Sequence, residues 1–161
     1  MYVVIEVMIV VVQGRVHNMK TKLQNKILNY KTGSNTSKEG LSWKYEDLSM
    51  NEKTYKLRKQ VISIIYEAKK LIPELPRVEV RICDMTGAAG LGYLGQNVIR
   101  IGLNAINSKN LRAVVYHELG HAVLGLEHNK ECPLMASGTG LYDLCRNHCE
   151  QIFLQLWKDS K

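Results

Sequence analysis

The chain has 161 residues, 45% of them hydrophobic, which fits one globular domain with one hydrophobic core. No apolar run approaches the roughly 18 residues that a membrane-spanning helix needs, so the sequence argues against a membrane protein. The net charge of +7 is concentrated in residues 15–81, where 15 Lys and Arg against 7 Asp and Glu leave a net of +8. No pattern of stacking aromatic residues accompanies this charge, and we interpret it as a solvated lysine-rich surface rather than a nucleic-acid site.

The N-terminal part of the chain is predicted to precede the folded domain. Residues 1–14 are mostly apolar but lack a basic start and a small-residue cleavage site. We therefore expect a buried strand or a poorly ordered extension, and a cytoplasmic protein, with secretion as the alternative. Translation from Met19 is a further alternative. Residues 13–47, which include NYKTGSNTSKEG, have the composition of a flexible linker. The predicted boundaries are 1–48 for this extension and basic linker, and 49–161 for the domain.

The first predicted elements of the domain are a helix and a strand. Ser49 and Glu52 have the spacing of a capping box, and apolar residues then recur with a helical period until Pro73 ends the helix. In residues 77–83, RVEVRIC, valine and isoleucine alternate with charged residues, which predicts a half-exposed strand. Residues 84–90 contain glycines and are expected to form a turn.

A hairpin and two further helices are predicted next. The hairpin turns at Gln96-Asn97, and its second arm is the alternating stretch 98–103. Ser108 is expected to cap the following helix, and a last helix with an apolar stripe spans roughly 141–157. This order predicts an α+β fold in which a small twisted mixed sheet packs against an N-terminal, a central and a C-terminal helix.

The helix after Ser108 carries the sequence HELGH. At about 100° per residue, its apolar arc faces the core, while His117 and His121 lie next to each other on a different face. Two imidazoles one turn apart can both bind one Zn²⁺ at about 2.0–2.1 Å, and Glu118 is placed to accept a proton from a metal-activated water. The pattern predicts His117 and His121 as metal ligands and Glu118 as a general base, on an amphipathic helix.

The residues that follow extend this pattern. Gly125 stands where the helix would end, because glycine readily takes the left-handed conformation that reverses the chain. His128 comes three residues later, and Met135 lies in the proline-containing turn CPLMAS. Residues 114–137 thereby resemble the metzincin metallopeptidases, whose pattern is HExxHxxGxxH followed by a methionine-bearing turn.

The resemblance covers about residues 78–157 and implies a zinc metallopeptidase that hydrolyses peptide bonds. It implies His128 as the third ligand beside the two helix histidines, Glu118 as the catalytic base and Met135 beneath the zinc. It also implies that a protein or peptide substrate binds in extended form along strand 98–103, as the edge strand over the cleft. We expect a monomer with one catalytic Zn²⁺ and no membrane partner.

The chain departs from the metzincin pattern by one residue, because it reads HExxHxxxGxxH. The Gly-x-x-His part is intact, so His128 is kept as the predicted third ligand. The alternative third ligands are Glu127, Cys132, Asp143 and His148.

The cysteines bear a weaker resemblance to archaemetzincins, which build a second zinc site from cysteines near the methionine turn and in a C-terminal CxxC. Here the C-terminal spacing is CxxxC, and Cys145 and Cys149 are interpreted as small buried residues of the last helix. A second structural zinc bound by Cys132, Cys145 and Cys149, with His148 as a further candidate ligand, is the alternative.

Two other functions stay open. One is a non-catalytic module stabilised by zinc, in which four protein ligands would close the metal site. The other is a basic nucleic-acid-associated protein or protease, whose binding would weaken with salt.

Overall fold

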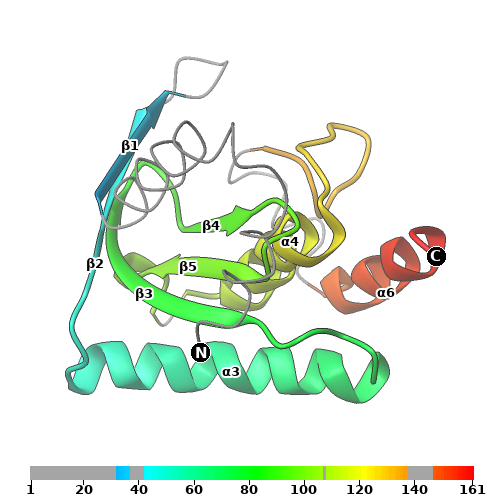
Figure 1. The fold of residues 1–161 in the computed structure, drawn as a ribbon, viewed down its shortest axis with the longest axis horizontal. Coiled ribbons are helices and arrows are strands. Elements are labelled where there is room, and N and C mark those ends of the chain that lie inside the picture. The colour runs from blue at the N-terminus through cyan, green and yellow to red at the C-terminus, as the bar shows by residue number, and fades with distance from the viewer. Residues whose placement is uncertain (1–31, 37–41, 107, 138–146) are drawn as a thin grey trace, which may run out of the picture.

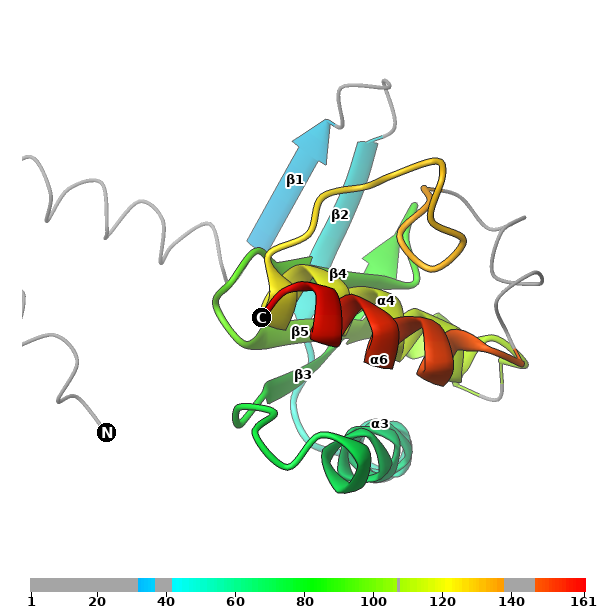
Figure 2. The same cartoon turned by 90° about the vertical axis from the view of Figure 1, so that its right-hand side faces the viewer.

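The computed structural model describes residues 32–36, 42–106, 108–137 and 147–161. In chain order the elements are β1 (Thr32–Thr36), β2 (Ser42–Asp47), α3 (Glu52–Leu71), β3 (Glu79–Thr86), β4 (Gly90–Tyr93), β5 (Val98–Gly102), a 3₁₀ turn (Leu103–Ala105), α4 (Leu111–Leu124) and α6 (Cys149–Asp159). Figures 1 and 2 show α3 lying beneath β3, and α6 packed against α4. The predicted α+β class is confirmed.

The sheet of the described residues has five strands in the order β1-β2-β3-β5-β4. β3 and β5 pair in parallel, and the other neighbours pair antiparallel, so the sheet is mixed as predicted. The predicted hairpin is present, with β4 and β5 joined through residues 94–97. Gly95 and Asn97 take left-handed φ values of 66° and 55° in this turn.

The strand predicted as the edge of the sheet is not at the edge. β5 covers most of residues 98–103, and it lies between β3 and β4. β4 is the edge strand on this side. The prediction failed because GLGY, residues 90–93, has four residues with two glycines and no alternation that would identify a strand.

Two strands lie in the stretch 13–47 that the sequence assigned to a linker. β1 pairs with β2, and β2 pairs with β3 from Lys44–Thr86 to Asp47–Cys83. β3 is longer than predicted, because residues 84–86 belong to it and not to a turn. The polar composition of this stretch led to the wrong prediction of a linker. β2 is stabilised by pairing with a strand more than thirty residues away, and such a distant partner leaves no signal in the local sequence. Residues 1–31, including the alternative start at Met19, lie outside the described residues.

α3 begins two residues later than predicted. Asn51 is its N-cap, with the Asn51 Oδ1 accepting from Thr54 N–H at 3.0 Å and the Thr54 Oγ1 accepting from Asn51 N–H at 2.7 Å. This reciprocal pair is a capping box, so the kind of cap was right and its position, Ser49 with Glu52, was wrong. The helix ends at Leu71, before Pro73, as predicted.

One face of the sheet packs against α3 and α4. Val80 and Ile82 of β3, and Ile99 and Ile101 of β5, are buried among the apolar residues of these helices. The alternation predicted for both strands is confirmed at these positions.

The opposite face carries a fully buried arginine, Arg100 of β5, which is 0% exposed. Its Nε and Nη2 lie 2.6 and 3.0 Å from the two carboxylate oxygens of Asp47 in β2. Its guanidinium lies 4.7 Å from the Tyr45 ring and 4.9 Å from the Tyr93 ring, and Nη1 donates to the Tyr93 hydroxyl. Removing one partner of a buried ion pair typically costs about 3–5 kcal/mol. The ion pair between Asp47 and Arg100 therefore links β2 to the β4–β5 hairpin, across the intervening strand β3.

The last helix is shorter than predicted. α6 begins at Cys149 and ends at Asp159, and residues 147–148 form a turn. Cys145 lies outside the described residues. Of the stripe predicted for this helix, Cys149 is buried, and Ile152 and Leu156 pack partly buried against the core. His148, predicted in the same stripe, is exposed, and the buried Phe153 was not predicted. None of the helices in the described ranges is long and apolar enough to span a membrane.

Candidate metal centre

α4 is buried on nearly all of its sides. Every residue from Ala113 to Ala122 is buried, so the prediction of an amphipathic helix is wrong. The face with His117 and His121 is covered by β4 and by the loop that follows α4. Such an all-round buried helix is typical of the centre of a domain. Its N-cap is Asn110, and not Ser108 as predicted. The Asn110 N–H donates to the Ser108 hydroxyl at 3.1 Å.

The C-terminal end of α4 is the glycine turn predicted from the sequence. The helix continues to Leu124, and Gly125 follows with a φ of 67°. The Gly125 N–H donates to the His121 carbonyl at 3.1 Å, which is the bond of a left-handed glycine cap. The residue added relative to the metzincin pattern is therefore accommodated by continuation of the α-helix before this cap.

The structure brings His117, His121 and His128 together. The Nε2 atoms of His117 and His121 are 3.1 Å apart, and those of His117 and His128 are 3.3 Å apart. Within the described ranges this is the one group of three or more potential metal ligands, with all ligand atoms within 4.8 Å of one another. The alternative third ligands Glu127, Cys132 and His148 are not in the group, and Asp143 lies outside the described residues.

Two backbone carbonyls orient the rings. The Nδ1 of His117 lies 2.5 Å from the Leu134 carbonyl oxygen, and the Nδ1 of His121 lies 2.5 Å from the Leu126 carbonyl oxygen. Because a carbonyl only accepts, each Nδ1 carries the ring proton and each Nε2 keeps its lone pair. Burial lowers the pKa of His117 to about 4 and also lowers that of His121, which keeps both rings neutral at pH 7. The hydrogen bonds to these two carbonyls could not be predicted from the sequence, because every residue has a backbone carbonyl.

The two distances from the His117 Nε2 to the other two imidazoles fit a small tetrahedral metal ion. Two nitrogens each about 2.0–2.1 Å from one zinc lie roughly 3.3 Å apart at the tetrahedral angle. The observed separations of 3.1 and 3.3 Å agree with this value. Lone pairs facing each other at such distances repel unless a cation lies between them. These three histidines can therefore hold a metal ion.

Glu118 lies beside the histidines without joining their group. It is 4% exposed, and its burial raises the pKa to about 8, while a hydrogen bond from the Gly92 backbone N–H acts to lower it. A carboxyl group with a pKa near neutrality can both accept and release a proton at physiological pH. Its carboxylate lies against β4, near Gly90 and within hydrogen-bonding reach of the Gly92 N–H.

Two glycines of β4 allow this strand to approach α4. A Cβ on Gly90 would lie 2.7 Å from the Glu118 Oε1, and a Cβ on Gly92 would lie 2.4 Å from the Glu118 carbonyl oxygen and 2.8 Å from the His121 Cβ. The hairpin turn is also bound to the end of α4, because the Gly95 N–H donates to the His121 carbonyl at 3.0 Å. The sequence analysis did not predict this role for Gly90 and Gly92. Gly90 and Gly92 are two residues apart and so lie on one face of the strand, which was the sequence signal for a close approach of another element.

Gly92→Ala is expected to destabilise the fold by about 3 kcal/mol, at the upper end for overpacking, because the new methyl group meets helix backbone that cannot move aside. Gly120→Ala is the matched comparison, since its Cβ would meet the Sδ of Met135, at the flexible end of that side chain, at 2.4 Å. Alanine also favours a helix over glycine by up to about 1 kcal/mol, so Gly120→Ala should change stability little. Urea unfolding of both variants measures the difference. A Gly92→Ala variant as stable as the wild type would contradict the close approach of β4.

Met135 lies against α4. It is 1% exposed, and its Sδ and Cε are the atoms nearest to Gly120, between the two helix histidines. The turn is closed by the Met135 N–H donating to the Cys132 carbonyl at 3.0 Å, and its carbonyl accepts from the Asn129 N–H at 2.9 Å. The turn thereby also holds Leu134, whose carbonyl orients His117. An open hollow of about 460 Å³ borders His128 and Met135 on the side of α6.

In the metal-free protein, Glu118 should make stability depend on pH. Its pKa of about 8 in the fold exceeds its ordinary value of 4.5, so the folded chain binds more protons than the unfolded chain between these values. The free energy of unfolding should therefore fall as the pH rises through this window, by up to about 1.4 kcal/mol per pH unit. His117, with a pKa lowered to about 4, acts in the opposite direction below its ordinary value of 6.5.

Urea unfolding in the presence of a chelator, from pH 6.5 to 8, isolates the contribution of Glu118. The wild type should lose stability across this range, and Glu118→Gln, which cannot ionise, should lose much less. Parallel pH profiles for the two proteins would show that the Glu118 carboxyl is not desolvated as its burial indicates.

Comparisons of the chain with protein-family models, with curated proteins and with solved structures give no match.

Proposed function

We propose that this protein is a zinc-dependent metallopeptidase of the metzincin type. The observation that carries the proposal is the convergence of three histidine Nε2 atoms beside a buried carboxylate that is not one of the ligands. His117, His121 and His128 would hold the metal, and three nitrogen ligands are a set that suits zinc. The resemblance of residues 114–137 to the metzincin pattern supports the same assignment.

The roles of the residues follow from their placement. A zinc ion held by the histidines would supply Lewis acidity, polarising the scissile carbonyl and lowering the pKa of water toward about 7. Glu118 would accept the proton of the attacking water and pass it to the leaving amine, for which a pKa near neutrality is suited. The Gly92 N–H, which is hydrogen-bonded to Glu118, would keep the carboxylate in place during proton transfer.

The substrate strand is proposed to pair with β4, in place of the predicted strand 98–103. Gly102 N–H donates to the Ala89 carbonyl, so the odd-numbered residues of β4 face β5. The backbone groups of Gly90 and Gly92 consequently face the edge of β4 that no other described strand pairs with, where the Gly92 N–H bonds Glu118 and the Gly90 groups and the Gly92 carbonyl are left for a substrate. A peptide added at this edge would place its backbone beside the metal and the base, and pairing through backbone groups suits substrates of many sequences.

The number of protein ligands favours a catalytic site over a structural one. A structural zinc is usually closed by four protein ligands, whereas a catalytic zinc keeps one position open. Among the described residues the group contains three ligands. The non-catalytic module is therefore the less favoured function.

The proposal is tested by measuring zinc per chain and cleavage of a peptide library by the same purified protein. One zinc per chain with cleavage that stops when a chelator removes the metal is the expected result. Tightly bound zinc without cleavage of any library member would favour the structural module instead. Absence of bound zinc would reject the metal assignment itself.

A further inference from the structure

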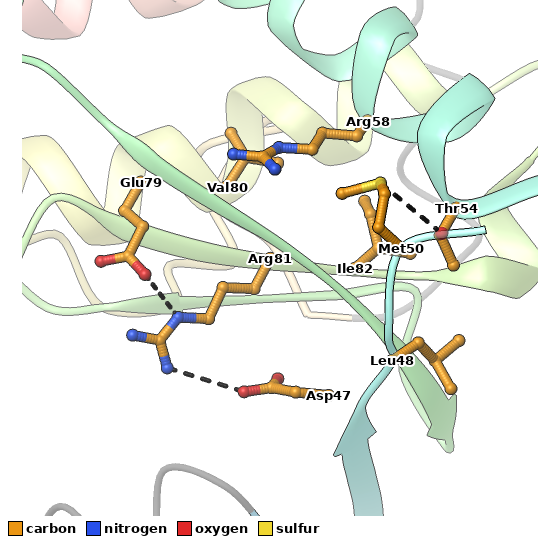
Figure 3. A pocket seen from close by; sticks show the side chains of 9 residues that line it. All are labelled: Asp47, Leu48, Met50, Thr54, Arg58, Glu79, Val80, Arg81 and Ile82. Carbon is orange, nitrogen blue, oxygen red and sulfur yellow. Dashed lines mark hydrogen bonds and ion pairs between the residues drawn. The ribbon is translucent and has the colours of Figure 1, made fainter. Parts of the chain in front are cut away.

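A second cavity lies between α3 and the first half of β3, away from the histidines. Its volume is about 250 Å³. Figure 3 shows the residues that line it: Asp47, Leu48, Met50, Thr54, Arg58, Glu79, Val80, Arg81 and Ile82. None of these residues belongs to the candidate metal centre. The volume is below the roughly 300–1,000 Å³ typical of sites for drug-sized ligands, so an occupant would be small.

The cavity opens onto a stretch of the β3 edge with which no other described strand pairs. The ladder between β2 and β3 ends at Asp47–Cys83, and the last bond runs from the Leu48 N–H to the Ile82 carbonyl at 2.9 Å. Beyond Leu48 the chain turns away to begin α3. On its other side β3 pairs with β5 through its odd-numbered residues, as the bond from the Glu79 N–H to the Asn97 carbonyl shows. Because backbone groups alternate along a strand, the N–H and C=O of Val80 face the cavity.

Arg58 supplies a positive charge at this edge. Its Nε is buried and has no hydrogen-bond partner among the described residues, and Arg58 forms no ion pair with any of them. Figure 3 shows the Arg58 side chain reaching to Val80, while Arg81 lies with Glu79 and Asp47. Arg81 Nε is 2.6 Å from Glu79 and its Nη1 is 3.6 Å from Asp47, so Arg81 is already engaged. A buried donor without an acceptor is costly, and Arg58 is the cation left for an incoming anion.

We propose that this cavity binds the C-terminal residue of a peptide. The terminal carboxylate would accept hydrogen bonds from Arg58 and from the Val80 N–H, and the amide N–H of the same residue would donate to the Val80 carbonyl. The bound residue thus takes the ladder position that the chain leaves vacant after Leu48, exchanging two backbone hydrogen bonds as paired antiparallel residues do. A charge-assisted bond to a guanidinium is about twice as strong as a neutral one, which selects a free carboxylate over an amide. The site is independent of the proposed peptidase activity.

The experiment titrates the full ¹⁵N-labelled chain with N-acetylalanine, and with its N-methylamide and acetate as comparison ligands. Carboxylates can also bind a metal held by the histidines, so the readout is the amide signal of Val80. N-acetylalanine should shift this signal, and the N-methylamide and acetate should each bind at least about tenfold more weakly. Arg58→Gln should weaken N-acetylalanine binding by at least about tenfold. Lys59→Gln removes the same charge from the next, exposed residue of α3 and should leave binding unchanged.

The alternatives give different results. Equal binding by wild type and a folded Arg58→Gln variant, checked by its thermal unfolding, would overturn the proposal. So would equal binding of the N-methylamide, since the carboxylate would then contribute nothing. Acetate binding as tightly as N-acetylalanine would identify a simple anion site and reject the peptide terminus. No shift at Val80 with N-acetylalanine at high concentration would reject the site.

Discussion

Glu118→Gln is expected to keep about one metal ion per chain and to lose peptidase activity by a factor of roughly 10²–10⁴, the range that general acid–base catalysis contributes. Glutamine has nearly the same shape and can still accept the hydrogen bond from the Gly92 N–H, so the packing of β4 on α4 should persist. It cannot take a proton from water at neutral pH. Because Glu118 lies outside the group of three histidines, metal content should not change.

The measurement pairs zinc content with initial rates on the best peptide of a library. Glu127→Gln is the matched control, because Glu127 is exposed, lies next to His128 and is not in the metal group. It should retain both zinc and activity. Undiminished cleavage by Glu118→Gln would refute the assignment of Glu118 as the base, and loss of zinc from it would make Glu118 a ligand.

His128→Ala is expected to weaken metal binding about as severely as His121→Ala. The two histidines differ in environment, since His121 is buried on α4 and His128 is exposed on the loop after Gly125. Their Nε2 atoms nevertheless converge with that of His117. The loss should exceed the roughly 10–100-fold that removal of an outer-shell partner costs, because a direct ligand is removed.

Competition with a chromogenic chelator measures both affinities. His148→Ala is the control, because His148 is also exposed and lies at the start of α6 outside the metal group. Unchanged affinity of His128→Ala would mean that another residue completes the site, and Cys132 and Glu127 would then have to be tested in turn.

Local signals in the sequence predicted the parts of the fold that local signals determine. The helical period, the glycine at position 125 and the 3.6-residue turn that juxtaposes His117 and His121 are properties of a single segment. The hairpin was likewise predicted from its turn residues. His128 reaches the two helix histidines because the loop after α4 folds back toward the helix. This contact was predicted only from the spacing of the metzincin pattern.

The errors concern features that depend on distant partners. β2 reads as a linker because its stability comes from pairing with β3 and from the buried ion pair of Asp47 with Arg100. β4 was not recognised as an edge strand, because its glycines are selected by the approach of α4 rather than by strand propensity. The N-caps of α3 and α4 were each predicted two residues too early, because several polar side chains near each helix start could act as the cap.

The ion pair between Asp47 and Arg100 also limits where the chain can be cut. Expressing residues 49–161 alone, as the predicted domain boundary would suggest, removes β2 and with it the carboxylate that compensates a fully buried guanidinium. The Cys83–Thr86 half of β3 would lose its neighbour at the same time, leaving unpaired backbone groups along a strand that could recruit another copy. Such a fragment should accumulate as aggregates, whereas one that keeps β1 and β2 should yield a monodisperse protein. A fragment intended for production should therefore start at or before Thr32, where β1 begins.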